Sequence, residues 1–142
     1  MQIIILDTNP IIAAQYQADK HCVKMVLETA QILSTIAGGP YKPTHQKHPC
    51  VLWAGQNRTN FNWLCRHGLA LAHEYTRRYG KRHKSQDVIE QIAWGFDAEH
   101  LPVGIAYRNY YHSKAAFASW KTQPPYWWKQ GEYRRYLCLA SQ

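Results

Sequence analysis

A narrow row of polar residues runs through one long apolar segment. The row is made of His21, Lys24, Glu28 and Gln31. Spacings of three and four residues place them on one side of a helix. Their neighbours make two apolar stripes, Cys22, Met25, Val26, Thr29, Ile32, Leu33 and Ile36 in one and Val23, Leu27 and Ala30 in the other. Two apolar stripes predict a helix buried around most of its circumference. The polar row then indicates the wall of an active site or ligand pocket, although a partly exposed stripe covered by loops would read the same way.

Glu28 is the acidic residue of this row that is best placed for proton transfer. The chain holds 9 acidic residues against 17 Lys and Arg, so candidate general acids and bases are few. Burial raises the pKa of a carboxyl group and a nearby Lys24 lowers it, which allows Glu28 to be tuned for acid–base work. We therefore expect Glu28, His21 and Lys24 to be the catalytic residues. Asp7 is also flanked by apolar residues, but Asp7-Thr8-Asn9 is more typical of local capping.

Positive charge is concentrated in two short segments. The loop 39–48 contains Lys42, His45 and His48, a group suited to phosphate binding or acid–base chemistry. The run 77–84 follows at the end of a predicted helix, where the helix dipole also favours cations. Five cations exceed what capping requires, so we expect phosphate contacts there too. The phosphate-binding candidates are Lys42, His45, His48, Arg77, Arg78, Lys81, Arg82, Lys84 and Arg108.

Aromatic residues are abundant and are interleaved with cations near the C-terminus. The chain has 6 Trp, 10 Tyr and 3 Phe and a net charge of +8, a balance that suits base and phosphate contacts. We expect Tyr107, Tyr111, Trp127 and Trp128 to stack on bases. A basic enzyme whose rings only fill its core would have the same composition.

The helices that must position these residues can be placed from caps, prolines and apolar periodicity. The sequence predicts a mainly α protein, a compact single-domain helical bundle over 1–142 with a short N-terminal strand or extended segment at 3–6. Helices are expected at 10–17 and 19–37, from Pro49, from a cap at Thr59 to 79, at 86–94, at 105–120 and from Pro125. Two prolines make 39–48 a loop.

Other classes of protein are disfavoured. No apolar stretch reaches the ~20 residues that span a bilayer. The four cysteines form no Cys-x-x-Cys pair, so we expect free thiols, no metal and no cofactor in a cytoplasmic protein. No Walker or Gly-x-Ser-x-Gly motif occurs. The oligomeric state is left open.

Several motifs resemble a family of small, uncharacterised phage-encoded proteins. The motifs are Asp19-Lys20-His21-x-x-Lys24-Met25-x-x-Glu28-Thr29-Ala30-Gln31, His48-Pro49-Cys50-x-x-Trp53, Glu74-Tyr75-x-x-Arg78-Tyr79-Gly80-Lys81-x-His83-Lys84-Ser85, Tyr107-Arg108-x-Tyr110-Tyr111 and Pro125-x-Trp127-Trp128-Lys129. The order of features is also similar, more remotely, to the pyrimidine-dimer DNA glycosylases of T-even phages and their bacterial relatives. That resemblance implies a compact all-helical fold that handles DNA with an extruded base.

Three functions are compatible with these observations. The leading hypothesis is a phage-type enzyme directed at nucleic acid or a nucleotide, an N-glycosylase or hydrolase of the host cytoplasm. A non-catalytic pocket that sequesters a small nucleotide is the alternative, and a plain duplex DNA-binding protein is a weaker one.

Overall fold

The computed structural model describes residues 2–95 and residue 121, and this part of the chain is mainly α, as the sequence predicts. Its helices are α1 Pro10–Gln15, α2 Asp19–Ala37, α3 Pro49–Ala54, α4 Arg58–Tyr79 and α5 Gln86–Gly95. Residues 3–6 are extended and bury Ile3, Ile4 and Leu6. The helices predicted at 105–120 and from Pro125 lie outside the described residues.

Side-chain caps and glycines set the ends of the helices. The Asn9 carboxamide accepts hydrogen bonds from the first backbone N–H groups of α1, which begins at Pro10. The long helices α2 and α4 end at Gly38 and Gly80, whose φ angles of 88° and 72° favour glycine. Asp7 accepts a 2.8 Å hydrogen bond from the Asn9 backbone N–H, which confirms its local structural role.

Two boundaries differ from the prediction by about two residues. The cap of α4 is Asn57, whose side chain accepts a 2.8 Å hydrogen bond from the Asn60 backbone N–H, so the expected cap at Thr59 is wrong. Asn57 is in the extended conformation that a cap requires, whereas Thr59 already belongs to the helix. Helix α1 ends at Gln15 rather than near 17.

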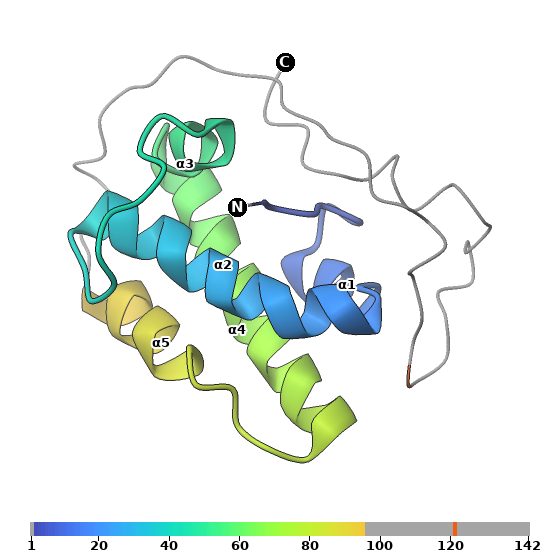
Figure 1. Ribbon diagram of the computed structural model, residues 1–142. Helices are drawn as coiled ribbons and strands as arrows, with labels where there is room; N and C mark the ends of the chain where they lie inside the picture. The colour runs from blue at the N-terminus through green and yellow to red at the C-terminus, as the bar shows by residue number, and fades with distance from the viewer. Residues whose placement is uncertain (1, 96–120, 122–142) are drawn as a thin grey trace.

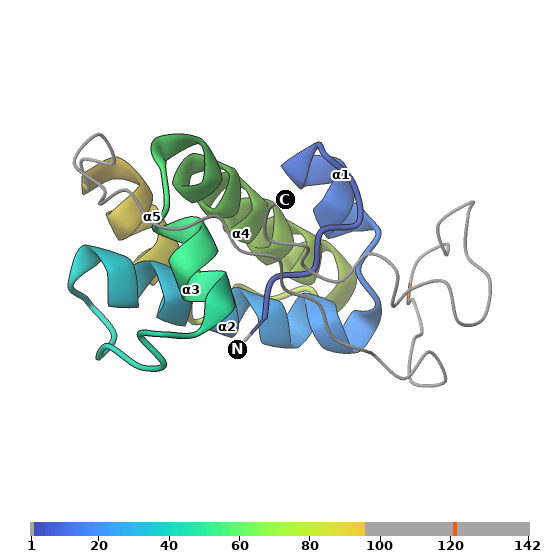
Figure 2. The same cartoon turned by 90° about the horizontal axis from the view of Figure 1, so that it is seen from above.

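Helix α4 is the central element, and α2 crosses in front of it in the view of Figure 1. Seen from above, the two helices form separate layers, and α1 packs against α4 (Figure 2). Helices α2 and α4 approach closely at Gly68, where a Cβ atom would lie 2.6 Å from Cγ2 of Thr29. The absence of a side chain at Gly68 makes this approach possible. Helix α5 packs against both α2 and α4, and α3 packs against the C-terminal half of α2 and the N-terminal half of α4. Helix α2, which bears the polar row, is therefore held in place by its packing against α3, α4 and α5.

The described residues include no membrane-spanning element, because none of their helices is both long and apolar enough to cross a bilayer. Cys22, Cys50 and Cys65 are buried free thiols. Burial raises the pKa of Cys22 and of Cys65 to about 12, so these two thiols are protonated and unreactive at neutral pH.

Candidate functional site

The polar row of α2 lies on the side of the helix that is turned away from α4. The side chain of Thr29 packs against α4 at Gly68. At about 100° per residue, Glu28 and Lys24 lie about 100° and 140° around α2 from Thr29. Glu28 is 6% exposed, Lys24 is exposed, and His21 and Gln31 are half-buried. The structure thus has a polar row in which the carboxylate is the most buried member.

The structure corrects the sequence-based interpretation of the second apolar stripe of α2, which consists of Val23, Leu27 and Ala30. Val23 and Leu27 are 37% and 41% exposed, and only Ala30 of that stripe is buried. The exposed residues of α2 are Lys20, Val23, Lys24 and Leu27, which lie within an arc of about 100°. Most of the circumference of α2 is therefore buried, as predicted, but Val23 and Leu27 lie in the exposed arc, where the sequence-based interpretation placed a buried stripe. Periodicity identifies an apolar stripe but not whether a neighbour covers it, and exposed apolar side chains are common on protein surfaces.

His21 is a neutral imidazole beside the carboxylate-bearing turn of α2. Burial, and secondarily the positive charge of Lys24, lower the pKa of His21 to about 4. At neutral pH this side chain can donate one hydrogen bond and accept another, but it adds no positive charge. Lys24 supplies that charge at the exposed edge of the row. A buried carboxylate, a neutral imidazole and an exposed ammonium on successive turns form a set suited to proton transfer next to an anionic ligand.

The loop 39–48 is fixed to the same side of α2 by Thr35, one turn beyond Gln31. The Thr35 hydroxyl donates to the Gln31 carbonyl oxygen at 2.8 Å and accepts from the Thr44 backbone N–H at 3.1 Å. The Tyr41 backbone N–H donates to the Ser34 hydroxyl at 3.2 Å. The structure therefore brings the histidine-containing loop and the polar row of α2 together, which spacing in the sequence could not establish.

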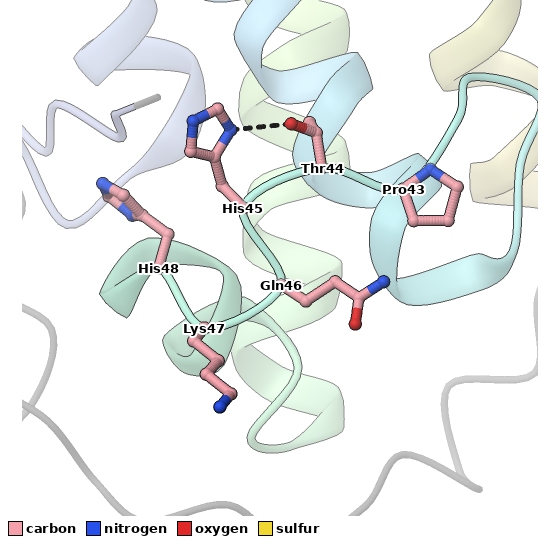
Figure 3. Close-up of a pocket in the computed structure, with 6 residues that line it drawn as sticks. All are labelled: Pro43, Thr44, His45, Gln46, Lys47 and His48. Carbon is pink, nitrogen blue, oxygen red and sulfur yellow. Dashed lines mark hydrogen bonds between the residues drawn. The ribbon is translucent and has the colours of Figure 1, made fainter.

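His45 and His48 form a pair at the end of this loop. Figure 3 shows both rings on the same side of the loop, away from Gln46. Their centroids are 6.5 Å apart in an edge-to-face arrangement. Residues 43–48 line an open hollow of about 560 Å³. A hollow of this size beside two imidazoles can receive a phosphate or a sugar, and exposed Lys47 adds positive charge at its rim.

The role of His48 is set partly by the backbone. Its Nδ1 accepts a 3.1 Å hydrogen bond from the Cys50 backbone N–H and so caps α3. Burial lowers the pKa of His48, and the positive charges of the chain N-terminus and of His45 lower it further. The ring is thus held neutral with its proton on Nε2, the nitrogen that is left to meet a ligand.

Arg78 is not a phosphate-binding residue, which corrects the sequence-based expectation. Its side chain is 0% exposed. The guanidinium donates to Glu74 Oε1 at 2.8 Å, to Asp19 Oδ1 at 3.1 Å, and to the carbonyl oxygens of Gln17 and Gln15 at 2.8 and 3.0 Å. Arg78 therefore joins the connection between α1 and α2 to the end of α4.

The other cations of the run 77–84 stay on the surface. Arg77 is 56% exposed although it pairs with Glu74, and Arg82 is 53% exposed although Asp87 and Glu90 hold it. Lys81 and Lys84 are exposed. This segment lies along the flank of α2, where His83 Nε2 is 2.9 Å from the Val23 carbonyl oxygen. The run is therefore beside the exposed apolar stripe rather than on the polar row, and any phosphate contact there is separate from the hollow at 43–48.

Two further groups of residues concern the aromatic C-terminal segment and α4. Arg108 and the expected stacking residues Tyr107, Tyr111, Trp127 and Trp128 lie outside the described residues. Arg58 and Arg66 of α4 were missed in the sequence, although both are exposed. The signal for Arg66 was present, because it lies opposite the apolar face of the predicted helix, whereas Arg58 lay outside that helix because its cap was placed at Thr59.

A family model for pyrimidine dimer DNA glycosylases matches residues 1–87. The chain belongs to this family. The match spans α1 to α4 and ends in the first turn of α5, so it includes the polar row of α2, the loop 39–48 and the run 77–84. No curated protein and no solved structure gives a significant match.

Membership in the glycosylase family decides between the broad classes that the composition left open. The chain is a DNA glycosylase-like protein directed at nucleic acid. The family implies a DNA substrate. The basic loop 39–48 and the exposed cations of α4 are therefore candidates for contacts with DNA phosphates.

Proposed function

We propose that this protein is a DNA N-glycosylase that excises a damaged base, with Glu28 as the general acid/base. The observation that carries the proposal is the burial of the Glu28 carboxylate in the one polar row of α2 that borders the loop 39–48. All of these residues lie inside the segment matched by the glycosylase family. The damaged base would be extruded from the duplex before reaction.

The reaction places specific demands on these side chains. When the bond between C1′ and the base nitrogen breaks, positive charge develops on the sugar, and a carboxylate close to it stabilises that charge. The oxygen of a water molecule then bonds to C1′, one of its protons passes to Glu28, and a proton returns to the departing base nitrogen. A neutral His21 suits this site because it can form hydrogen bonds without adding a positive charge that would repel the charged sugar.

The remaining residues of the site would hold the DNA backbone. Lys24 lies one turn from Glu28, and His45 and His48 line the hollow of the loop 39–48. Lys42 is exposed on the same loop. Their contacts fix the register of the backbone and carry no base specificity.

The test is Glu28→Gln assayed on a duplex with one cyclobutane pyrimidine dimer. Glutamine keeps the size of the side chain and removes its ability to take up a proton. We expect base release in single-turnover reactions to fall by about 100-fold or more, on the scale of general acid–base catalysis, while duplex affinity stays within threefold. Gln31→Glu, which adds a carboxylate one turn away, should leave Glu28→Gln inactive.

The outcomes separate the three functions. Full base release by Glu28→Gln would contradict the assigned mechanism. Wild-type protein that binds the duplex without releasing a base would point to the DNA-binding role. A stoichiometric nucleotide released on gentle denaturation and seen by mass spectrometry would point to sequestration.

A further inference from the structure

The exposed face of α4 carries arginines in its N-terminal half and at its C-terminal end. Within α4 the exposed residues are Arg58, Thr59, Asn62, Arg66, His73, Thr76 and Arg77. We call this set the α4 ridge. It contains three arginines and no exposed acidic side chain, because Glu74, the acidic residue of this helix, is 5% exposed and is paired with Arg77 and Arg78. An exposed helix normally mixes charges of both signs, so a face of one sign indicates an anionic partner.

The α4 ridge lies on the opposite side of the bundle from the candidate active site. Gly68 marks the side of α4 that contacts α2. Arg66 and Arg77 are about 160° and 180° around the helix from Gly68, and Arg58 is about 80° from it on the same side. Lys24 is about 140° around α2 from Thr29, the residue that meets Gly68. The α4 ridge and Lys24 of the polar row therefore lie on the outward sides of α4 and α2, respectively. Figure 2 shows these two helices as separate layers.

The spacing of the cations fits an extended anion better than a compact one. Arg58 and Arg77 are 19 positions apart in one helix, which corresponds to about 28 Å. That distance equals about eight steps of duplex at 3.4 Å each. A single phosphate or nucleotide would occupy only one end of such a surface.

Neutral hydrogen-bond donors lie between the arginines. Thr59, Asn62 and Thr76 are exposed on the same face, and such side chains commonly donate to phosphate oxygens. At the C-terminal end of the ridge an open hollow of about 420 Å³ is lined by His73, Thr76, Arg77, Arg82 and Gln86. The ridge thus has both the charge and the donors of a surface that follows a sugar–phosphate backbone.

We propose that the α4 ridge binds the backbone of a second segment of nucleic acid, without sequence preference, while the α2 face holds the segment under repair. The inference rests on the proposed function for the choice of nucleic acid as ligand. With one segment on each face, the protein can pass between neighbouring duplexes without full release into solution.

The first experiment measures salt dependence on an undamaged duplex. The variant Arg58→Gln/Arg66→Gln/Arg77→Gln removes three cations, and Arg58→Lys/Arg66→Lys/Arg77→Lys is its charge-preserving control. We expect the slope of log affinity against log salt to become less steep by about 2.7 in the Gln variant only. A fourfold rise in salt then weakens the wild type about 40-fold more than the Gln variant. An unchanged slope in the Gln variant, or an equal change in the Lys variant, overturns the proposal.

The second experiment tests for two segments directly. A dye-labelled duplex is presented to an immobilised duplex in the presence of the protein. The wild type and the Lys variant should retain the dye, and the Gln variant should not. Retention by the Gln variant at the wild-type level overturns the proposal. Glu28→Gln, with its ridge intact, should retain the dye even though it releases no base, so a failure of the ridge is distinguishable from a failure of the proposed enzyme.

Discussion

Replacing Arg78 with methionine should destabilise the protein strongly while leaving its phosphate contacts unchanged. The buried guanidinium donates to the carboxylates of Glu74 and Asp19 and to the carbonyl oxygens of Gln17 and Gln15. Methionine has a similar length but donates no hydrogen bond. The variant therefore leaves four acceptors without this donor.

The expected cost follows from those acceptors. Breaking a buried ion pair costs about 3–5 kcal/mol, because the remaining charge is left without its partner. Each backbone carbonyl deprived of its donor adds about 1–3 kcal/mol if water cannot reach it. Arg77 stays paired with Glu74 through a 3.2 Å contact from its Nε, which offsets part of the loss. We expect a decrease of about 4 kcal/mol in the free energy of unfolding, a large share of the ~5–15 kcal/mol typical of a domain.

Urea unfolding followed by circular dichroism measures this cost. The matched control is Arg66→Met, an exposed arginine of the same helix, which should change the free energy of unfolding by less than about 0.5 kcal/mol. Below its unfolding transition, Arg78→Met should bind duplex DNA with the salt slope of the wild type. The reasoning is refuted if Arg78→Met loses less than about 1 kcal/mol and also lowers that slope by about 0.9, the signature of one lost phosphate contact.

Two further predictions concern His67 and the start of α4. Burial lowers the pKa of His67 to about 4, although its contact with the Pro10 carbonyl oxygen raises it slightly; the unfolded chain therefore takes up the proton first as the pH falls. The free energy of unfolding should drop by about 3 kcal/mol between pH 6.5 and 4 from this group, and His67→Phe should remove that part of the pH dependence in urea unfolding. Asn57→Ala should cost about 1 kcal/mol through loss of the cap, whereas Thr59→Ala should stay within about 0.5 kcal/mol by thermal unfolding, and the reverse order would restore Thr59 as the cap.

Local signals predicted most of the helical framework. Asn9-Pro10, Gly38 and Gly80 mark helix ends through the backbone conformations that these residues favour, and the structure has ends at all three. The cap of α4 was misplaced because Asn57 and Thr59 are both good capping residues. Choosing between them requires the backbone angles, which are extended at Asn57.

The candidate site was predictable in part. The row of His21, Lys24 and Glu28 follows from helical spacing alone, and the structure confirms that the Glu28 carboxylate is buried. The position of the loop 39–48 beside this row depends on the hydrogen bond between Thr35 and Thr44, which are nine positions apart. The irregular backbone between them has no periodicity from which this contact could be predicted. The neutral state of His21 likewise depends on packing around it.

The sequence by itself determined the helices within residues 2–95, the loop between α2 and α3 and the excess of positive charge. Caps, prolines, apolar periodicity and composition act locally or on the whole chain. Only the tertiary structure decided which charges meet solvent. Arg77 and Arg78 are adjacent, yet one is 56% exposed and the other 0%. A rotation of about 100° along α4 turns the second toward acceptors some sixty positions earlier. Such long-range partners leave no local pattern, so burial of a charge had to be seen in the fold.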